Sequence, residues 1–246
     1  MRRLIIFSIS FLALTVVSAA EEGALLHARV NLSDKASLQR GARIFVNYCQ
    51  GCHSAAFVRY SRLAKDLGIS EDVLKKNFMF GTDKPGDMMT SSLSRDEGVQ
   101  FFNVAPPDLS VIARARGADW LYSYFLTFYR DDKRPTGVNN LTFKDVAMPH
   151  VLWKLQGWQR PVLKEGVEPA EKIEAEDIDH LELETPGELD EKGYAETVND
   201  LVNFMVYMGE PAKLKRYQIG GWVMVYLFVL LIVVYLLKKE YWRDVH

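Results

Sequence analysis

Cysteine is scarce in this sequence. Only two of its 246 residues are cysteines, Cys49 and Cys52, and both lie within one five-residue stretch. If both thiols hold a cofactor, no disulfide can form, even in an oxidising compartment. A strong excess of one charge is also missing, since 30 Lys and Arg residues face 32 Asp and Glu residues, for a formal net charge of -2. No nucleic acid partner is therefore expected.

Long runs without a charged residue are also few, and the first stands at the start of the chain. It follows Arg2 and Arg3, is mostly apolar over residues 4–17, and closes with the small residues 18–20. This order is typical of a secretory signal peptide, so residues 1–20 are predicted to be removed. An N-terminal membrane anchor is the alternative. A mitochondrial presequence would be amphipathic and Arg-rich, so a bacterial protein is favoured.

The second such run covers residues 219–237 and contains no charge. As a helix it would be about 28 Å long, close to the hydrocarbon thickness of a bilayer. We therefore predict a transmembrane helix over residues 217–238, with a buried core helix as the alternative. If the signal peptide exports what precedes it, residues 21–216 form a periplasmic domain. Residues 239–246 then form a cytoplasmic tail, and the chain crosses the bacterial inner membrane once.

The predicted exported domain contains helical patterns separated by long loops. Apolar residues recur at helical spacing in four stretches, residues 37–48, 109–116, 120–129 and 197–208. Gly, Pro, Asp and Ser predict a loop over residues 81–110, and residues 130–140 have the composition of a turn. No strand with sustained alternation is expected. The predicted fold class is mainly α with long loops, plus one C-terminal transmembrane helix. Loops this long are unusual in a compact domain unless something organises them, and a large apolar group can do so.

An acidic segment covers residues 164–192. Between Glu165 and Glu191 there are twelve Asp or Glu residues and one lysine, Lys172. One interpretation is a solvated, mobile insertion. The other is a negative surface that attracts a basic partner and raises the rate of association.

The two cysteines belong to the motif Cys49-Gln50-Gly51-Cys52-His53. This C-x-x-C-H pattern is typical of c-type haem attachment, because two thiols at this spacing form thioethers with the two vinyl groups of one porphyrin edge. His53 can then place its imidazole on the iron. A zinc site would need further ligands, and no other cysteine exists. A redox dithiol would have no use for His53. The sequence therefore predicts a cytochrome c-like domain with one covalent haem c.

The sixth iron ligand decides whether such a haem carries electrons or binds small molecules. Met148 is the predicted ligand, because Pro149 holds the chain extended there and its distance in sequence from His53 suits a loop across the far haem face. The alternatives that remain open are His150 and the methionines of the loop region, Met79, Met88 and Met89. Met205 and Met208 lie on an apolar helical stripe and are expected in the core.

Other polar and stiff residues suit the surroundings of a porphyrin. Pro106 and Pro107 would lay a stiff apolar edge against the ring, and Asp108 or Ser110 would cap the helix that follows. Arg114 and Arg116 on that helix are candidates to pair with the haem propionates. Simple exposure of these arginines is the alternative.

Four motifs of the sequence occur in one order: Cys49 to His53, residues 105–110 with Ala115 and Arg116 after them, Met148-Pro149, and Gly209-Glu210-Pro211 before the last span. In this order the chain resembles cytochrome c1, the haem subunit of the cytochrome bc1 complex, in a bacterial form, over nearly the whole mature chain. The resemblance implies His53 and Met148 as axial ligands and Arg116 as a propionate contact. It also implies that Asn103 and Pro107 lie near the haem.

The resemblance implies an electron-transfer subunit of a quinol:cytochrome c oxidoreductase. The chain would take electrons from a Rieske iron–sulfur protein and pass them to a cytochrome c, in one complex with cytochrome b. It would do no chemistry in isolation. The alternatives are a free-standing membrane-tethered cytochrome and the haem subunit of a terminal oxidase. A peroxidase needs an open haem, which ligation by Met148 would prevent.

Overall fold

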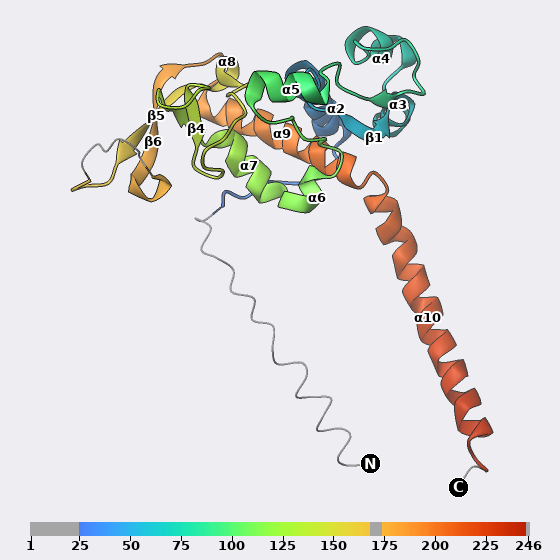
Figure 1. The fold of residues 1–246 in the computed structure, drawn as a ribbon. Helices are drawn as coiled ribbons and strands as arrows, with labels where there is room; N and C mark the ends of the chain where they lie inside the picture. Colours follow the sequence, from blue (N-terminus) through green and yellow to red (C-terminus); the bar gives the residue numbers. More distant parts are fainter. Residues whose placement is uncertain (1–24, 168–173, 245–246) are drawn as a thin grey trace.

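The structure, a computed structural model, describes residues 25–167 and 174–244. The predicted signal peptide lies outside the described residues. Helices, connecting segments and three short strand pairs gather into one domain, and a single long helix projects from it (Figure 1). The mainly α fold class with long connections is therefore confirmed.

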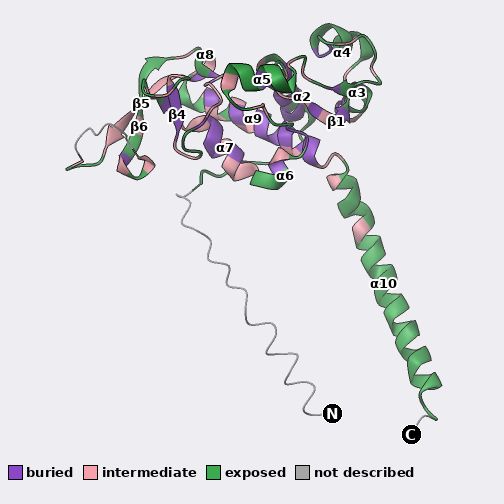
Figure 2. Cartoon of the chain, viewed as in Figure 1, coloured by how far each residue is buried: buried purple, intermediate pink, exposed green. Residues whose placement is uncertain are grey.

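Two helices that are far apart in sequence form the centre of the domain. They are α2 (Lys35–Ile44) and α9 (Glu191–Gly209), which lie side by side. Asp34 caps α2 by accepting a hydrogen bond from the backbone of Ser37. The apolar stripe predicted for the first helix is buried and consists of Leu38, Ala42, Ile44 and Phe45. Figure 2 shows that buried residues concentrate in α9 and the elements around it.

The first helix changes its pitch before it reaches the cysteines. It begins two residues before the predicted range of 37–48, and from Phe45 it continues as the π-helix η1 (Phe45–Cys49). The Gln50 backbone N–H bonds to the Phe45 carbonyl five residues earlier, at 2.9 Å. Single π turns are frequent at functional sites.

The predicted loop 81–110 is partly wrong, because it contains a helix. Three short helices follow the cysteines, α3 (Tyr60–Leu67), α4 (Glu71–Asn77) and α5 (Arg95–Phe102). Ser94 and Glu97 form a capping box at the start of α5. This S-x-x-E signal was present in the sequence and is the reason that a Gly- and Asp-rich region becomes helical there.

The helices predicted over 109–116 and 120–129 exist with different ends. They are α6 (Ile112–Arg116) and α7 (Ala118–Leu126), joined at Gly117, whose φ of 89° favours glycine. The first helix begins late because the residues before it bind a strand instead. The second ends early because the chain becomes extended at Phe128.

No strand with sustained alternation was expected, but the described residues do form strands, of which β6 has nine residues. The structure has three antiparallel pairs: β1 (Ala55–Arg59) with β2 (Met88–Met89), β3 (Phe128–Arg130) with β4 (Val138–Asn140), and β5 (Gly157–Leu163) with β6 (Ile178–Pro186). The turn predicted over 130–140 is thus the tip of a hairpin. The alternation Leu181-Glu182-Leu183-Glu184 in β6 was a short strand signal within the acidic segment.

The acidic segment is consequently an ordered element in its described part. Its first helical turn is η2 (Ala175–Asp177), β6 pairs with β5, and α9 begins at Glu191. A short helix, α8 (Trp153–Gln156), leads into β5. An interpretation as a mobile insertion therefore does not describe residues 174–192.

Helix α10 (Lys213–Tyr241) leaves the domain and has no buried residue (Figure 2). Its most apolar 18-residue window has a mean hydropathy of 2.5. A helix this long that is apolar on every side is stable only in a lipid environment or against a partner. The predicted transmembrane helix is confirmed. Arg216 donates two hydrogen bonds to the Glu210 carboxylate, at 2.5 and 3.1 Å, and thereby ties the start of α10 to the end of α9.

Helices α2 and α9 approach each other closely at Gly41. A Cβ added there would lie 2.0 Å from the Asp200 carbonyl oxygen and 2.7 Å from the Phe204 Cβ. Gly41→Ala is therefore expected to lower the free energy of unfolding by about 1–3 kcal/mol, because the helices must move apart. Chemical denaturation of the full chain in detergent, followed by circular dichroism, measures this change.

Gly81→Ala is the matched control, since a Cβ there meets nothing within 4 Å. Equal stability of the two variants would contradict the close contact between α2 and α9.

Candidate functional site

A cavity of about 340 Å³ lies between the cysteine motif, α6, α7 and the segment that precedes α8. Its lining is almost entirely apolar or aromatic. Besides the cysteine motif it includes Tyr48, Phe102, Val104, Pro106, Pro107, Leu109, Ile112, Arg116, Trp120, Leu121, Tyr124, Phe125, Phe143, Val146, Ala147, Met148, Pro149, Val151 and Met205. Such a cavity suits a large flat apolar group with few polar substituents.

Cys49, Cys52 and His53 all line this cavity. The motif begins in the last turn of η1, and the backbone N–H groups of Cys52 and His53 both bond to the Cys49 carbonyl, at 3.1 and 2.9 Å. Burial raises the pKa of the Cys49 thiol to about 12. A redox dithiol needs a lowered thiol pKa. The surroundings of Cys49 therefore disfavour the dithiol alternative.

His53 is oriented by a single hydrogen bond. Its Nδ1 lies 2.7 Å from the Pro107 carbonyl oxygen. Because a carbonyl oxygen only accepts, Nδ1 carries the proton and Nε2 keeps its lone pair. Burial lowers the pKa of His53, which favours the neutral ring. A neutral imidazole fixed through Nδ1 is the form that binds a metal through Nε2.

The segment that carries Pro107 is itself fixed to the chain just after the motif. The Leu109 N–H bonds to the Ser54 carbonyl at 2.8 Å. Asp108 accepts a hydrogen bond from the Ala56 N–H at 2.9 Å, and the Ser110 hydroxyl accepts one from Phe57 at 3.0 Å. The prediction that Asp108 or Ser110 caps α6 is therefore wrong. Both side chains bind the backbone of β1 and hold the proline segment beside His53.

Two of the chain's methionines line the cavity, Met148 and Met205. Tyr124 approaches the first, with its hydroxyl oxygen 3.5 Å from the Met148 sulfur, a geometry in which the hydroxyl donates to the thioether. Met205 belongs to the buried stripe of α9, as expected, yet it also reaches the cavity. Tyr124 was not among the predicted site residues.

The other alternative ligands do not line the cavity. His150 is buried, and its ring stacks on that of Phe128 with centroids 4.9 Å apart. Met89 is buried in the short strand pair and pairs with Ala55, whereas Met88 is exposed.

Arg116 lies at the cavity and Arg114 does not. The Arg116 guanidinium carbon is 5.0 Å from the ring centroid of Trp120 and 5.7 Å from that of Phe143. Trp120 also stacks on Tyr124, with centroids 5.1 Å apart and an interplanar angle of 9°. Trp120 and Tyr124 are four residues apart within α7, a spacing that indicated a shared face, whereas Arg116 comes from the end of α6.

Asn103 is not among the cavity residues, although Phe102 and Val104 on either side of it are. It adopts a left-handed conformation, with φ of 58°, and ends α5. Its place in the structure is thus that of a helix C-cap, a position at which Asn is common.

The residues present fit a c-type haem. An apolar cavity is lined by two adjacent thiols, an oriented imidazole, a thioether and one guanidinium. In the described part of the chain no group of three or more His, Cys, Asp or Glu side chains could hold a metal ion. This finding disfavours the zinc alternative.

The mainly helical domain, this cavity and the projecting apolar helix define a membrane-anchored protein of the c-type cytochrome class. The sequence profile of the Cytochrome C1 family matches residues 27–79 and 75–245. The chain belongs to the cytochrome c1 family, which implies a haem c cofactor and a part in electron transport.

Three relatives show how far the similarity extends. Cytochrome c1 of Allochromatium vinosum is 47% identical over 100% of this chain and 100% of the relative. A Nitrosomonas europaea protein named ammonia monooxygenase gamma subunit is 47% identical over 93% of this chain and 92% of its own length. Cytochrome c1 of Rhodospirillum rubrum is 30% identical over 86% of this chain and 83% of the relative.

Proposed function

We propose that this chain is the cytochrome c1 subunit of a quinol:cytochrome c oxidoreductase, the bc1 complex. One haem c would be held by thioethers to Cys49 and Cys52, with His53 and Met148 as axial ligands. The haem supplies a one-electron centre. The observation that carries the proposal is the shared cavity, because it brings together Cys49, Cys52, His53 and Met148 in a chain of this family.

The surrounding residues have separate roles in this proposal. Pro107 fixes the imidazole of His53 through its carbonyl oxygen. Trp120 and Tyr124 form an apolar wall that excludes water. Arg116 brings a positive charge to the cavity and would pair with a propionate. A filled sixth position and a dry cavity favour electron transfer over binding of oxygen or peroxide.

The proposed partners follow from the family. The chain would receive electrons from a Rieske iron–sulfur protein, stand in one complex with cytochrome b, and reduce a cytochrome c. Helix α10 would cross the bacterial inner membrane once, with residues 21–216 in the periplasm and the C-terminus in the cytoplasm. A free-standing tethered cytochrome and a terminal oxidase subunit are the alternatives. The name of the Nitrosomonas relative adds a monooxygenase as a further association to test.

Purification from the native membrane in mild detergent tests the association. We expect a b-type cytochrome and a Rieske protein to co-purify with the chain. Haem should stay on the chain through denaturing electrophoresis, because thioethers survive unfolding. A Cys49→Ala, Cys52→Ala double variant is the control and should lose this haem. Co-purification with oxidase or monooxygenase subunits, or with none, would contradict the bc1 assignment.

Substitution of Met148 tests the axial ligand. Met148→Lys should retain the haem but lower its reduction potential, by on the order of 100 mV or more, because a nitrogen donor favours ferric iron more than a thioether does. The weak far-red absorption band of ferric methionine ligation should disappear. Redox titration and optical spectra of the purified complex measure both effects.

Met88→Lys is the matched control, since Met88 is exposed and does not line the cavity. It should leave the band and the potential unchanged. Met205→Leu tests whether the second cavity methionine is the iron ligand instead, because Leu fills a similar volume but cannot ligate iron. If the far-red band is unaltered in Met148→Lys and lost in Met205→Leu, then Met205 is the axial ligand of the iron.

The acidic segment supports docking of a basic partner less strongly than its composition suggests. Its carboxylates are partly neutralised by basic residues of neighbouring elements. Three ion pairs do this: Arg130–Glu184 at 3.0 Å, Arg160–Glu182 at 2.6 Å and Lys144–Glu174. The carboxylates left for long-range attraction include Glu165, Glu176 and Glu188, which are exposed.

Charge neutralisation tests this role without removing β6. The triple variant Glu165→Gln, Glu176→Gln, Glu188→Gln should slow reduction of a basic cytochrome c about two- to tenfold at low ionic strength and flatten the salt dependence. Stopped-flow kinetics measure the rate, and the haem spectrum should not change.

The control for this charge variant removes three charges elsewhere, with Asp72→Asn, Asp83→Asn and Asp96→Asn. If the two triple variants reduce cytochrome c at the same rate, the acidic segment does not attract the partner and is only a solvated surface.

A further inference from the structure

Residues 26–31, named here the N-terminal strap, lie along α7 and α9 without forming a helix or strand. Side chains of both helices hold the backbone of the strap. From α7, the Ser123 hydroxyl accepts a hydrogen bond from the Leu26 N–H at 2.8 Å, and Asp119 accepts one from Ala28 at 2.8 Å. Asp119 also lies 3.2 Å from the His27 ring.

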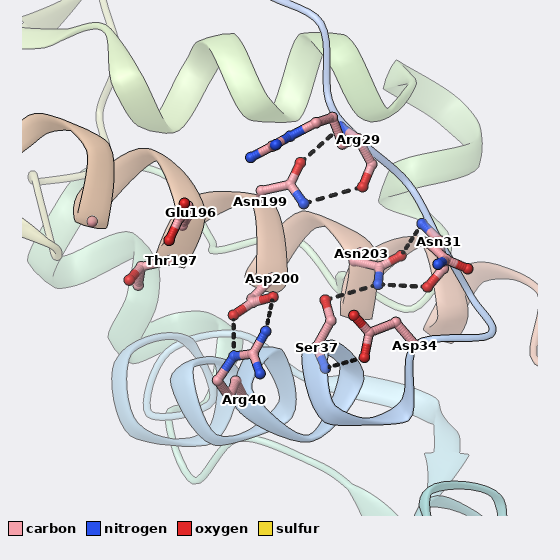
Figure 3. A pocket seen from close by; sticks show the side chains of 11 residues that line it. Arg29, Asn31, Asp34, Ser37, Arg40, Glu196, Thr197, Asn199, Asp200 and Asn203 are labelled. Carbon is pink, nitrogen blue, oxygen red and sulfur yellow. Dashed lines mark hydrogen bonds and ion pairs between the residues drawn. The ribbon is translucent and has the colours of Figure 1, made fainter.

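On α9 two asparagines each bind both backbone groups of one strap residue (Figure 3). Asn199 accepts from the Arg29 N–H at 2.7 Å and donates to the Arg29 carbonyl at 3.1 Å. Asn203 does the same with Asn31, at 3.0 and 2.9 Å. A side-chain amide is the group that can donate and accept together, as a neighbouring β-strand would. The two asparagines are four residues apart and therefore share one face of α9.

The faces of α7 separate the strap from the cavity. Asp119 and Ser123 bind the strap, whereas Trp120, Leu121 and Tyr124 line the cavity. The same nine-residue helix thus has one side on the strap and the other on the proposed haem site.

Helix α7 packs on α9 and its C-terminal carbonyls are bound, but two features leave its first turn in need of a further hold. An isolated helix of nine residues is marginal in water. It also begins at Gly117, where a positive φ and open space around the Cα give the chain freedom to pivot. The strap bonds to the first turn and the middle of α7 and fastens it to the long helix α9.

The effect reaches Met148 through one contact. Tyr124 lies on the cavity side of α7, and its hydroxyl is 3.5 Å from the Met148 sulfur. A shift of α7 would therefore move the aromatic wall away from the thioether and admit water.

The strap is open to solvent on its outer side. A polar hollow of about 430 Å³ lies beside it, between the strap, α2 and α9, and its wall includes Arg29, Arg40 and Asp200 (Figure 3). Asn199 belongs to this wall, so water can reach its bonds to the strap.

We propose that the N-terminal strap is a positioning element for the haem pocket: through Asp119 and Asn199 it fixes α7 to α9 and thereby keeps Tyr124, on which Trp120 stacks, against Met148. The inference deepens the proposed function and rests on it. Asp119 and Asn199 touch neither the cavity nor Met148, so they are positioning residues that act through α7.

The test uses the full haem-loaded chain in detergent with the double variant Asp119→Ala, Asn199→Ala. We expect amide hydrogen exchange in the strap and α7 to become about tenfold faster or more, since three hydrogen bonds from these side chains to the strap backbone are lost. The far-red band of ferric methionine ligation should weaken, and the ferrous form should bind carbon monoxide more readily than the wild type does.

Two further variants make the result specific. Asp119→Asn keeps the acceptor for the Ala28 N–H. When it replaces Asp119→Ala in the double variant, exchange and spectrum should return part of the way to the wild type, to the level of the single variant Asn199→Ala. The control is Asp72→Ala, Asn77→Ala, which removes the same two side-chain types from α4, and it should change neither measurement. If the double variant does not retain haem, the milder single variant Asn199→Ala, which loses only the two bonds to Arg29, replaces it.

Either of two results would overturn the proposal. Unchanged exchange in the strap would show that these side chains do not hold it. Faster exchange with an unaltered band and unaltered carbon monoxide binding would show that the strap does not position the pocket. A wild-type protein without the far-red band would instead contradict ligation by Met148, while the exchange data would still report the hold of the strap on α7.

Discussion

The hydrogen bond from His53 Nδ1 to the Pro107 carbonyl is the interaction on which the site depends. It fixes the tautomer and the ring direction of the proposed proximal ligand. The Pro107 carbonyl is held in place, because the residues that follow it form hydrogen bonds with Ser54 and with the first residues of β1. The proline-rich stretch therefore supports His53 in addition to forming part of the apolar cavity wall. A metal ligand supported in this way keeps one orientation during changes of redox state.

Local signals in the sequence were sufficient for part of this arrangement. The spacing of Cys49, Cys52 and His53 is sufficient to predict haem attachment. The uniform apolar run before the C-terminus is sufficient to predict a transmembrane helix, because such a helix can be recognised without knowledge of its tertiary contacts. The stripes of α2 and α9 were also predictable, because a buried face leaves a period of three and four in the sequence. Pro107 was placed near the haem only through resemblance to the family, and the structure adds its hydrogen bond to His53.

Features that arise between distant segments could not be predicted in the same way. The role of Asp108 and Ser110 depends on β1, which lies about fifty residues earlier, so a local reading assigned them to the nearest helix. Tyr124 lies at the cavity on α7, which packs against α9, a helix far away in the sequence. Strand β6 of the acidic segment was not predicted, because its short alternation stands among many charged residues. The capping box of α5 was not recognised, because the glycines and aspartates around it favoured a loop.

The geometry of α10 limits where the proposed haem can be. About six helical residues, or about 9 Å of helix, separate the end of the domain from the apolar run, and the Glu210–Arg216 pair keeps this short stalk from swinging. A domain held so close to a bilayer searches for membrane partners in two dimensions rather than three. Its encounters with them are then set by lateral density and orientation, whereas a partner from solution must approach from the side that faces away from the lipid.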